Sequence, residues 1–224
     1  MGNTSGVLPK NSLNAFKTSI QLVAAVDAYL LDSSSLSSVA QTYGHPIGIW
    51  NVSQILDLNG LFDADRNALT AGFNEDIRSW DVSSCTSMKN TFRGAEIFNQ
   101  NLSLWNTGKV TSMFRMFRGA RSFRGEGLST WDVSKVVDFS STFRGASAFR
   151  EDLLAWNVSS VGNAKSMFAH ATAFRQNLCS WGGRLHNNVT IKLNGMFVES
   201  GCVETDDPDL SASPRGPFCH SCTV

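Results

Sequence analysis

The stretch WDVSSCTSMKNTFRGAEIFNQNLSLW, residues 80–105, begins and ends with tryptophan, and this spacing decides the fold. The six tryptophans stand at 50, 80, 105, 131, 156 and 181, so the gaps between them are 30, 25, 26, 25 and 25 residues. A fixed period of this size is the signature of a repeat protein. The chain of 224 residues therefore carries six repeats, which we call coils 1 to 6 after their tryptophans.

Apolar residues recur at the same distances from the tryptophan, which we count as repeat position 0, in coils 2, 4 and 5, while coil 3 takes one extra residue after Phe123. They stand at positions 2, 5, 8, 12, 15, 18 and 22, which in coil 2 are Val82, Cys85, Met88, Phe92, Ala95, Phe98 and Leu102. The segment L-x-x-W-x-V ends in an alternation typical of a short strand. Positions 8, 12, 15 and 18 step by four, three and three, which predicts a helical turn or two with one buried stripe.

A strand and a helical turn enclose only half a core, so one repeat cannot bury its apolar face without its neighbours. We therefore predict an α/β solenoid: a right-handed superhelix of about six coils, each a short strand plus a short helical segment. Every tryptophan is then the same core position in a successive coil.

The two ends of such a stack need caps, because each would otherwise expose an apolar face. At the N-terminus we predict a capping helix from about Ser12. Its inward stripe is expected to be Leu13, Phe16, Ile20, Val23 and Leu30. The chain then divides into a capping helix and linker (residues 1–46), the repeat solenoid (47–201) and an irregular tail with cysteines (202–224). Together they form one structural domain.

Composition excludes several classes of protein. Nineteen basic and nineteen acidic residues cancel, so the whole-chain charge indicates neither a nucleic-acid binder nor an acidic solubilising domain. Residues 80–180 nevertheless hold twelve Lys and Arg against seven Asp and Glu, a local net charge of +5. The most apolar run, IQLVAAVDAYLL from Ile20, is interrupted by Asp27 and lacks a convincing cleavage site. We expect a helix there, with no membrane span and no signal peptide.

Arginine is the most distinctive surface feature. FRGA occurs three times and places Arg93, Arg118 and Arg144 at repeat position 13, which we call the first arginine column. Arg124, Arg150 and Arg175 form the second arginine column, and Arg115 and Arg121 add charge in coil 3. Stacked like charges repel, so a bound anion or acidic partner would explain them. The alternative is that each arginine before glycine ends a helical turn, offsets the helix dipole and covers phenylalanine with its stem.

The five cysteines are of two kinds. Cys85 stands at a core position that is valine in other coils, so we expect a buried thiol, and we expect Cys179 to be unpaired. The disulfide candidates are Cys202, Cys219 and Cys222. A zinc site with His220 and free thiols are the alternatives, but adjacent Cys219 and His220 are poor simultaneous ligands, and we predict no metal. A disulfide would favour an oxidising compartment.

No constellation of residues predicts catalysis. The histidines, His45, His170, His186 and His220, are scattered over the chain, and no nucleophile–base pair or phosphate loop accompanies them. We therefore expect no enzyme, no catalytic residue and no cofactor. The Asn and Asp residues directly after the tryptophans suggest a polar ladder rather than a calcium site. Among the glycosylation sequons, Asn188 in a long loop is the best candidate.

The repeats resemble a known family. WDVSSCTSM, TFRGAEIFNQNLSLW and FNEDIRSWDVS are similar to the BspA-like surface-protein repeats of mycoplasma and diatom proteins, a domain of unknown function. AVDAYL, YGHPIGIWNVS and GPFCHSC are most like the diatom members, and the resemblance covers about residues 16–222. It implies a leucine-rich-repeat-like solenoid, often at the cell surface, with partner binding or adhesion proposed and no catalytic residues. The second arginine column stands where the family usually has asparagine.

These observations together predict a non-enzymatic binding or adhesion module. We expect it at the cell surface or outside the cell, as a monomer that binds a protein or an anionic glycan, and we do not expect nucleic acid as its partner. The alternative is a cytoplasmic scaffold whose arginine-rich face binds an acidic protein or nucleic acid.

Overall fold

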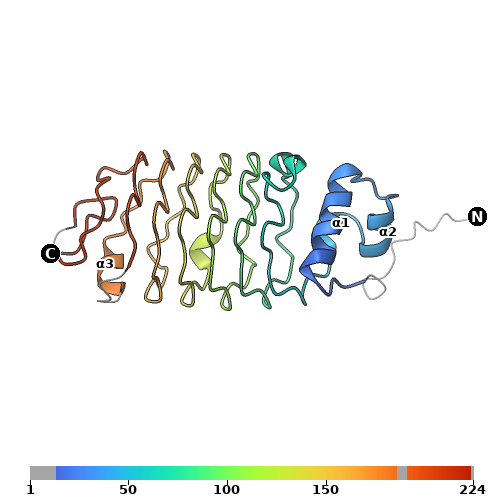
Figure 1. Cartoon of the computed structure of the whole chain (residues 1–224), viewed down its shortest axis with the longest axis horizontal. Coiled ribbons are helices and arrows are strands. Elements are labelled where there is room, and N and C mark those ends of the chain that lie inside the picture. The colour runs from blue at the N-terminus through green and yellow to red at the C-terminus, as the bar shows by residue number, and fades with distance from the viewer. Residues whose placement is uncertain (1–13, 186–190, 223–224) are drawn as a thin grey trace, which may run out of the picture.

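The computed structural model describes residues 14–185 and 191–222. The chain winds into a row of stacked coils, with helices at the N-terminal end and an irregular tail at the other end (Figure 1). The predictions made for Ser12, Leu13, His186 and Asn188 lie outside the described residues.

Regular secondary structure is scarce. Two helices, α1 (Ser19–Leu31) and α2 (Ser38–Tyr43), lie at the N-terminal end (Figure 1). The other elements are η2 (Ile47–Ile49), η3 (Ala68–Gly72), η4 (Leu128–Thr130) and α3 (Ser180–Arg184). Residues 14–185 and 191–222 contain no β-strand; isolated parallel bridges link successive coils at Asp57, Ser87, Ser112, Asp138, Asn163 and Lys192. The prediction of an α/β solenoid with a strand and a helical segment in each coil is therefore wrong.

Left-handed backbone explains why the predicted helical segment does not form. At repeat position 10 the φ angles are 55° at Asn90, 54° at Arg115, 56° at Ser141 and 55° at Ser166. At position 14 the glycines of FRGA, Gly94, Gly119 and Gly145, have φ of 70–74°. A right-handed helix needs negative φ throughout, so two such residues between positions 8 and 18 interrupt it. The predicted strand is replaced by a turn, in which Trp105 N donates to Leu102 O at 3.1 Å.

Tight turns produce the apolar spacing that suggested a helix. The amide of Ala95 donates to the carbonyl of Phe92 at 3.2 Å, and the amide of Phe98 donates to the carbonyl of Ala95 at 3.2 Å. Hydrogen bonds between neighbouring coils run in both directions. Met88 N donates to Ser112 O at 3.0 Å, and Phe92 N donates to Met116 O at 2.8 Å. In the opposite direction, Thr111 N donates to Thr86 O at 2.8 Å and Ser122 N donates to Glu96 O at 2.9 Å, so each coil both donates to the next coil and accepts from it.

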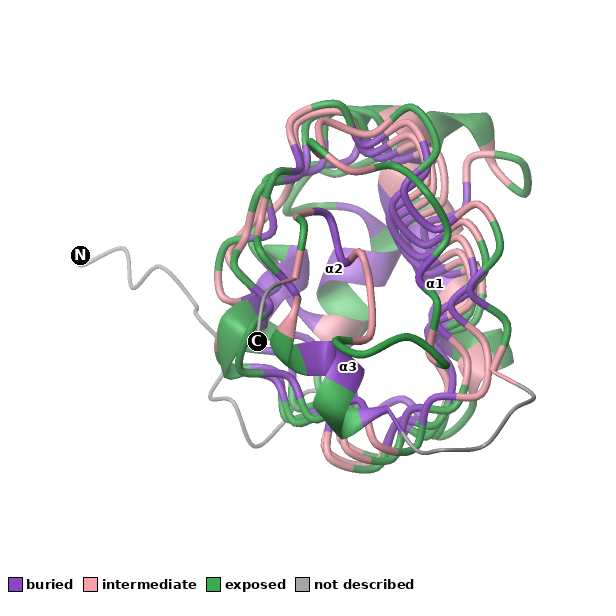
Figure 2. Ribbon diagram, turned by 90° about the vertical axis from the view of Figure 1, so that its left-hand side faces the viewer, coloured by how far each residue is buried: buried purple, intermediate pink, exposed green. Residues whose placement is uncertain are grey.

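The core runs through the centre of the stack. Figure 2, which looks along the row of coils, shows buried segments recurring at the same places in successive coils. All six tryptophans are 1–4% exposed. In coils 2 to 6 the indole N–H donates to the carbonyl three residues before the preceding tryptophan, for example from Trp105 to Ile77 at 3.1 Å and from Trp131 to Leu102 at 3.0 Å. The prediction that each tryptophan is the same core position is confirmed.

Phenylalanines form two further columns. At repeat position 12, the rings of Phe92, Phe117 and Phe143 stack with centroids 5.4 and 5.7 Å apart. At position 18, Phe98 and Phe123 stack at 5.8 Å, and within coil 2 the rings of Phe92 and Phe98 lie 4.1 Å apart. Each buried aromatic contributes about 1.5–3 kcal/mol by area, so these columns supply much of the stability.

The N-terminal helix begins later than predicted. Its N-cap is Thr18, whose hydroxyl accepts a hydrogen bond from Gln21 N at 3.2 Å. Its buried residues are Leu22, Ala25, Val26 and Tyr29. Ile20, expected inside, is 82% exposed, so its place in the predicted stripe is wrong, whereas Val23 and Leu30 are partly buried against the core. Phe16 is buried but precedes the helix, and its amide donates to Asn51 O at 3.0 Å, which places the segment before α1 against coil 1.

Candidate anion-binding surface

The first arginine column lies on three neighbouring coils. Its backbone carbonyls accept hydrogen bonds from amides of the preceding coil: Arg93 from Ala64 at 2.8 Å, Arg118 from Gly94 at 2.7 Å and Arg144 from Gly119 at 2.8 Å. All three side chains are half-buried. Successive coils therefore present the same side chain at the same place.

Arg93 is neutralised by coil 1. Its guanidinium lies 3.6 Å from Asp63 and also pairs with Asp65. Burial raises the pKa of Asp63, which the charge of Arg93 opposes. The sequence analysis did not identify these acidic partners, although both lie just after Phe62, where coil 1 departs from the repeat. At its coil 1 end, the first arginine column therefore carries an arginine that is neutralised by ion pairs.

Arg118 occupies the centre of a cluster of like charges. Desolvation lowers the pKa of Arg118, and the charges of Arg115, Arg93 and Arg144 lower it further. Arg115 lies with its guanidinium carbon 4.5 Å from the centre of the Phe114 ring. The structure thus concentrates positive charge in coil 3, where Arg115 and Arg118 both lie.

The second arginine column is exposed. In coils 1 and 2 the same position is asparagine: the Asn74 side-chain oxygen accepts from Asn99 N at 2.8 Å, and the Asn99 oxygen accepts from Arg124 N at 3.0 Å. Arginine has no acceptor, so this amide ladder ends at Arg124. Arg175 donates from Nε to Gly201 O at 3.2 Å, which ties the end of the column to the following coil.

Arg121 lies between the columns along the chain, 3.6 Å from Glu96, and both side chains are exposed. An exposed ion pair of this kind contributes little to stability. Arg121 therefore adds less net charge to the surface than the sequence suggested.

A helical role for the arginines has no basis in the structure. Among the described residues, none of the FRGA segments lies in a helix, so there is no helix dipole for Arg93, Arg118 or Arg144 to offset. The part of the alternative explanation that depends on a helix is wrong.

The polar residues after the tryptophans stabilise turns. The side-chain oxygen of Asp81 accepts from Ser83 N at 3.0 Å, and that of Asp132 accepts from Ser134 N at 3.0 Å. These hydrogen bonds lower the pKa of both carboxyl groups. Asparagine or aspartate is needed because its short side chain reaches the amide two residues on.

Two disulfides fasten the tail. Cys202 pairs with Cys219, and Cys222 pairs with Cys179, with Cα atoms 4.7 and 5.5 Å apart. The expectation that Cys179 is unpaired is wrong, because the tail folds back onto coil 6. Cys85 is a buried free thiol. Within residues 14–185 and 191–222, no three His, Cys, Asp or Glu side chains are grouped as a metal site would require.

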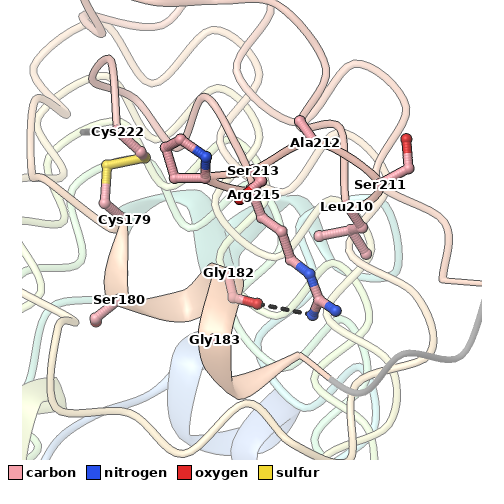
Figure 3. Close-up of a pocket in the computed structure, with 11 residues that line it drawn as sticks. Cys179, Ser180, Gly182, Gly183, Leu210, Ser211, Ala212, Ser213, Arg215 and Cys222 are labelled. Atoms are coloured by element: carbon pink, nitrogen blue, oxygen red, sulfur yellow. Dashed lines mark hydrogen bonds between the residues drawn. A yellow bond between two sulfur atoms is a disulfide. The ribbon is translucent and has the colours of Figure 1, made fainter. Parts of the chain in front are cut away.

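The tail and α3 enclose a shallow hollow of about 660 Å³ (Figure 3). Arg215 lies in it and donates to the carbonyls of Gly182 at 3.0 Å and Leu185 at 3.1 Å. Arg215 thus holds the tail against α3.

The stacked coils and the arginine surface that they carry define a repeat protein. Residues 32–127 and 105–207 match the family described as "Mycoplasma protein of unknown function, DUF285", which is the BspA-like repeat family. The chain belongs to this family. The finer likeness to diatom members remains a prediction. No curated protein and no solved structure matches the chain. None of the described helices has the length and apolarity that a membrane crossing requires.

Proposed function

We propose that this chain is a non-enzymatic binding module whose arginine columns engage an anionic partner, either an acidic protein or a sulfated glycan. The observation that carries the proposal is the presence of arginines on successive coils that have no ion pair in the described part of the chain, among them Arg118, Arg144, Arg124 and Arg150. The planar fork of arginine meets sulfate or carboxylate through two hydrogen bonds, which lysine cannot reproduce.

The cysteines support a location at the cell surface or outside the cell. Four of the five cysteines lie in disulfides, and such bonds persist in oxidising compartments. A cytoplasmic scaffold would keep these thiols reduced, so this alternative has less support.

The test is a triple change of Arg118, Arg124 and Arg150 to Gln, measured against an extended polyanion such as heparin at low and physiological salt. We expect affinity to fall strongly in the variant, and the affinity of the parent to fall with salt, because exposed charges are screened over about 8–10 Å.

A matched control removes three exposed charges away from the columns: Lys17→Gln, Arg78→Gln and Lys192→Gln. Equal heparin affinity in the two triple variants would contradict the proposal, provided both melt at the parent temperature.

A further inference from the structure

We infer that Arg115, Arg118 and Arg144 form a compact binding site for one tetrahedral oxyanion, the sulfate or phosphate monoester of a larger partner. This site deepens the proposed function and rests on it, since it names one place on the arginine surface and the group that it holds.

Arg115 supplies the first part of the argument. Its Nε is buried and has no hydrogen-bond partner within the described ranges, 14–185 and 191–222. A buried donor without a partner costs about 1–3 kcal/mol. Its backbone is also left-handed, with φ of 54°, where coils 1 and 6 have glycine. The chain thus leaves a donor of the Arg115 guanidinium unused beside the first arginine column.

The local charge supplies the second part. Arg93, Arg115, Arg118 and Arg144 carry four positive charges, and the acidic groups that pair with Arg93 are Asp63 and Asp65. The four arginines and two aspartates together carry a net charge of +2, and Arg115, Arg118 and Arg144 have no ion pair among the described residues. A dianion would neutralise it.

The short extent of the arginine cluster limits the size of the ligand that it can bind. At repeat position 13, coil 1 has Asp63 and coil 5 has Ala169, so the column of arginines ends on both sides. Gly94, Gly119 and Gly145 follow the arginines, and a Cβ built on Gly119 or Gly145 would lie 3.8 Å from the glycine of the preceding coil. The arginine side chains therefore start from closely packed backbone segments. This arrangement favours the binding of one small anion over that of a long polyanionic chain.

The experiment measures the melting temperature of the whole chain with sodium sulfate, sodium phosphate and sodium chloride at matched ionic strength. We expect sulfate, phosphate or both to raise it more than chloride does. The preferred anion identifies the source as a sulfate or a phosphate ester. Arg118→Gln combined with Arg144→Gln should weaken the apparent affinity by about tenfold or more, because hydrogen bonds to charged groups are strong.

The matched control is Arg124→Gln with Arg150→Gln, which removes the same charge from the second arginine column. The site is supported if this control variant still binds the oxyanion and the Arg118/Arg144 variant does not. That result would support the site even if the parent does not bind heparin. Equal anion effects in both pairs, or no excess over chloride in the parent, would overturn the site while leaving heparin binding along the columns intact.

Two further measurements guard against misfolding. Arg118→Lys keeps the charge but loses the planar fork, and we expect it to fold and still bind the oxyanion more weakly than the parent. In the parent, the Arg115 Nε–H resonance should shift on titration with the preferred anion. An unmoved resonance at saturating anion would also overturn the assignment.

Discussion

In each of coils 2 to 6 the tryptophan indole nitrogen donates to the backbone carbonyl three residues before the preceding tryptophan. Trp131 donates to Leu102 O at 3.0 Å, and the same carbonyl accepts the backbone N–H of Trp105 at 3.1 Å. The ring also stacks on Trp105 with centroids 6.3 Å apart and planes at 2°. One residue therefore supplies apolar burial, stacking and a hydrogen bond to a buried carbonyl, which explains why tryptophan recurs at this position.

Replacing Trp131 with Ala should lower the free energy of unfolding by about 3–5 kcal/mol, because a large buried ring is lost and leaves a cavity. Chemical denaturation measures the change. Ile20→Ala is the control: this side chain is 82% exposed, so its truncation should change stability by no more than about 0.5 kcal/mol. Similar losses in the two variants would contradict the account of the core.

Cys85 should resist alkylation in the native protein. Burial raises the pKa of its thiol to about 12, so almost no thiolate exists at pH 8. Iodoacetamide without reductant should label no cysteine of the folded chain and one per chain in urea. Mass spectrometry of the digests should find that label on Cys85; labelling of the tail cysteines under native conditions would contradict the disulfides.

The turns of each coil depend on the sign of φ. Asn90, Arg115 and Ser141 adopt left-handed backbone at a position where glycine would be less costly. They are held there by hydrogen bonds on both sides: Arg115 N donates to Ser140 O at 3.0 Å, and Phe114 O accepts from Asn90 N at 2.9 Å. Contacts between coils thus determine local conformation more than the residue type does.

Gly119→Ala should test this conformation. The φ of Gly119 is 74°, and an added Cβ would meet nothing closer than 3.8 Å, so the cost is one of backbone alone, about 1–2 kcal/mol. Gly72→Ala is the matched change at a glycine without positive φ and with open space around its Cβ. It should be neutral or stabilise by up to about 1 kcal/mol. Thermal unfolding measures both variants. A melting temperature lower for Gly72→Ala than for Gly119→Ala would contradict the left-handed turn at Gly119.

The whole chain is a row of equivalent coils closed by two different structures. At one end α1 packs its buried face against the stack, and at the other end the tail folds back onto coil 6. Phe218 of the tail is fully buried, and Leu178 N donates to its carbonyl at 3.2 Å. The tail therefore covers the last coil as a cap would, without being helical.

Removing the disulfides should affect stability unequally. The bond between Cys179 and Cys222 spans 43 residues, and the bond between Cys202 and Cys219 spans 17. Loop-closure entropy gives stabilisations of about 4 and about 3 kcal/mol respectively. The double variants Cys179→Ser/Cys222→Ser and Cys202→Ser/Cys219→Ser should both unfold at a lower denaturant concentration than the parent. The midpoint should be lower for the variant without the Cys179–Cys222 bond than for the other. Unchanged midpoints would show that the tail does not contribute to the stability of the stack.

The amino-acid sequence was sufficient to find the period, the tryptophan column and the residues that line the core. These follow from spacing alone, because a repeat must place the same residue in the same environment. It also identified the arginine surface as a set of positions. It did not identify the turns, since apolar steps of four, three and three suit consecutive tight turns as well as a helix.

Contacts between distant segments decided the rest. Arg93 pairs with Asp63 and Asp65 of the neighbouring coil, and Cys179 is bonded to Cys222 of the tail. The positive φ of Arg115 likewise depends on hydrogen bonds to the neighbouring coil. No local pattern encodes them, because hydrogen bonds, charge pairs and disulfides depend on which coil lies against which. Local spacing therefore fixes the composition of the core, whereas packing between coils fixes the backbone conformation and the charges that remain free.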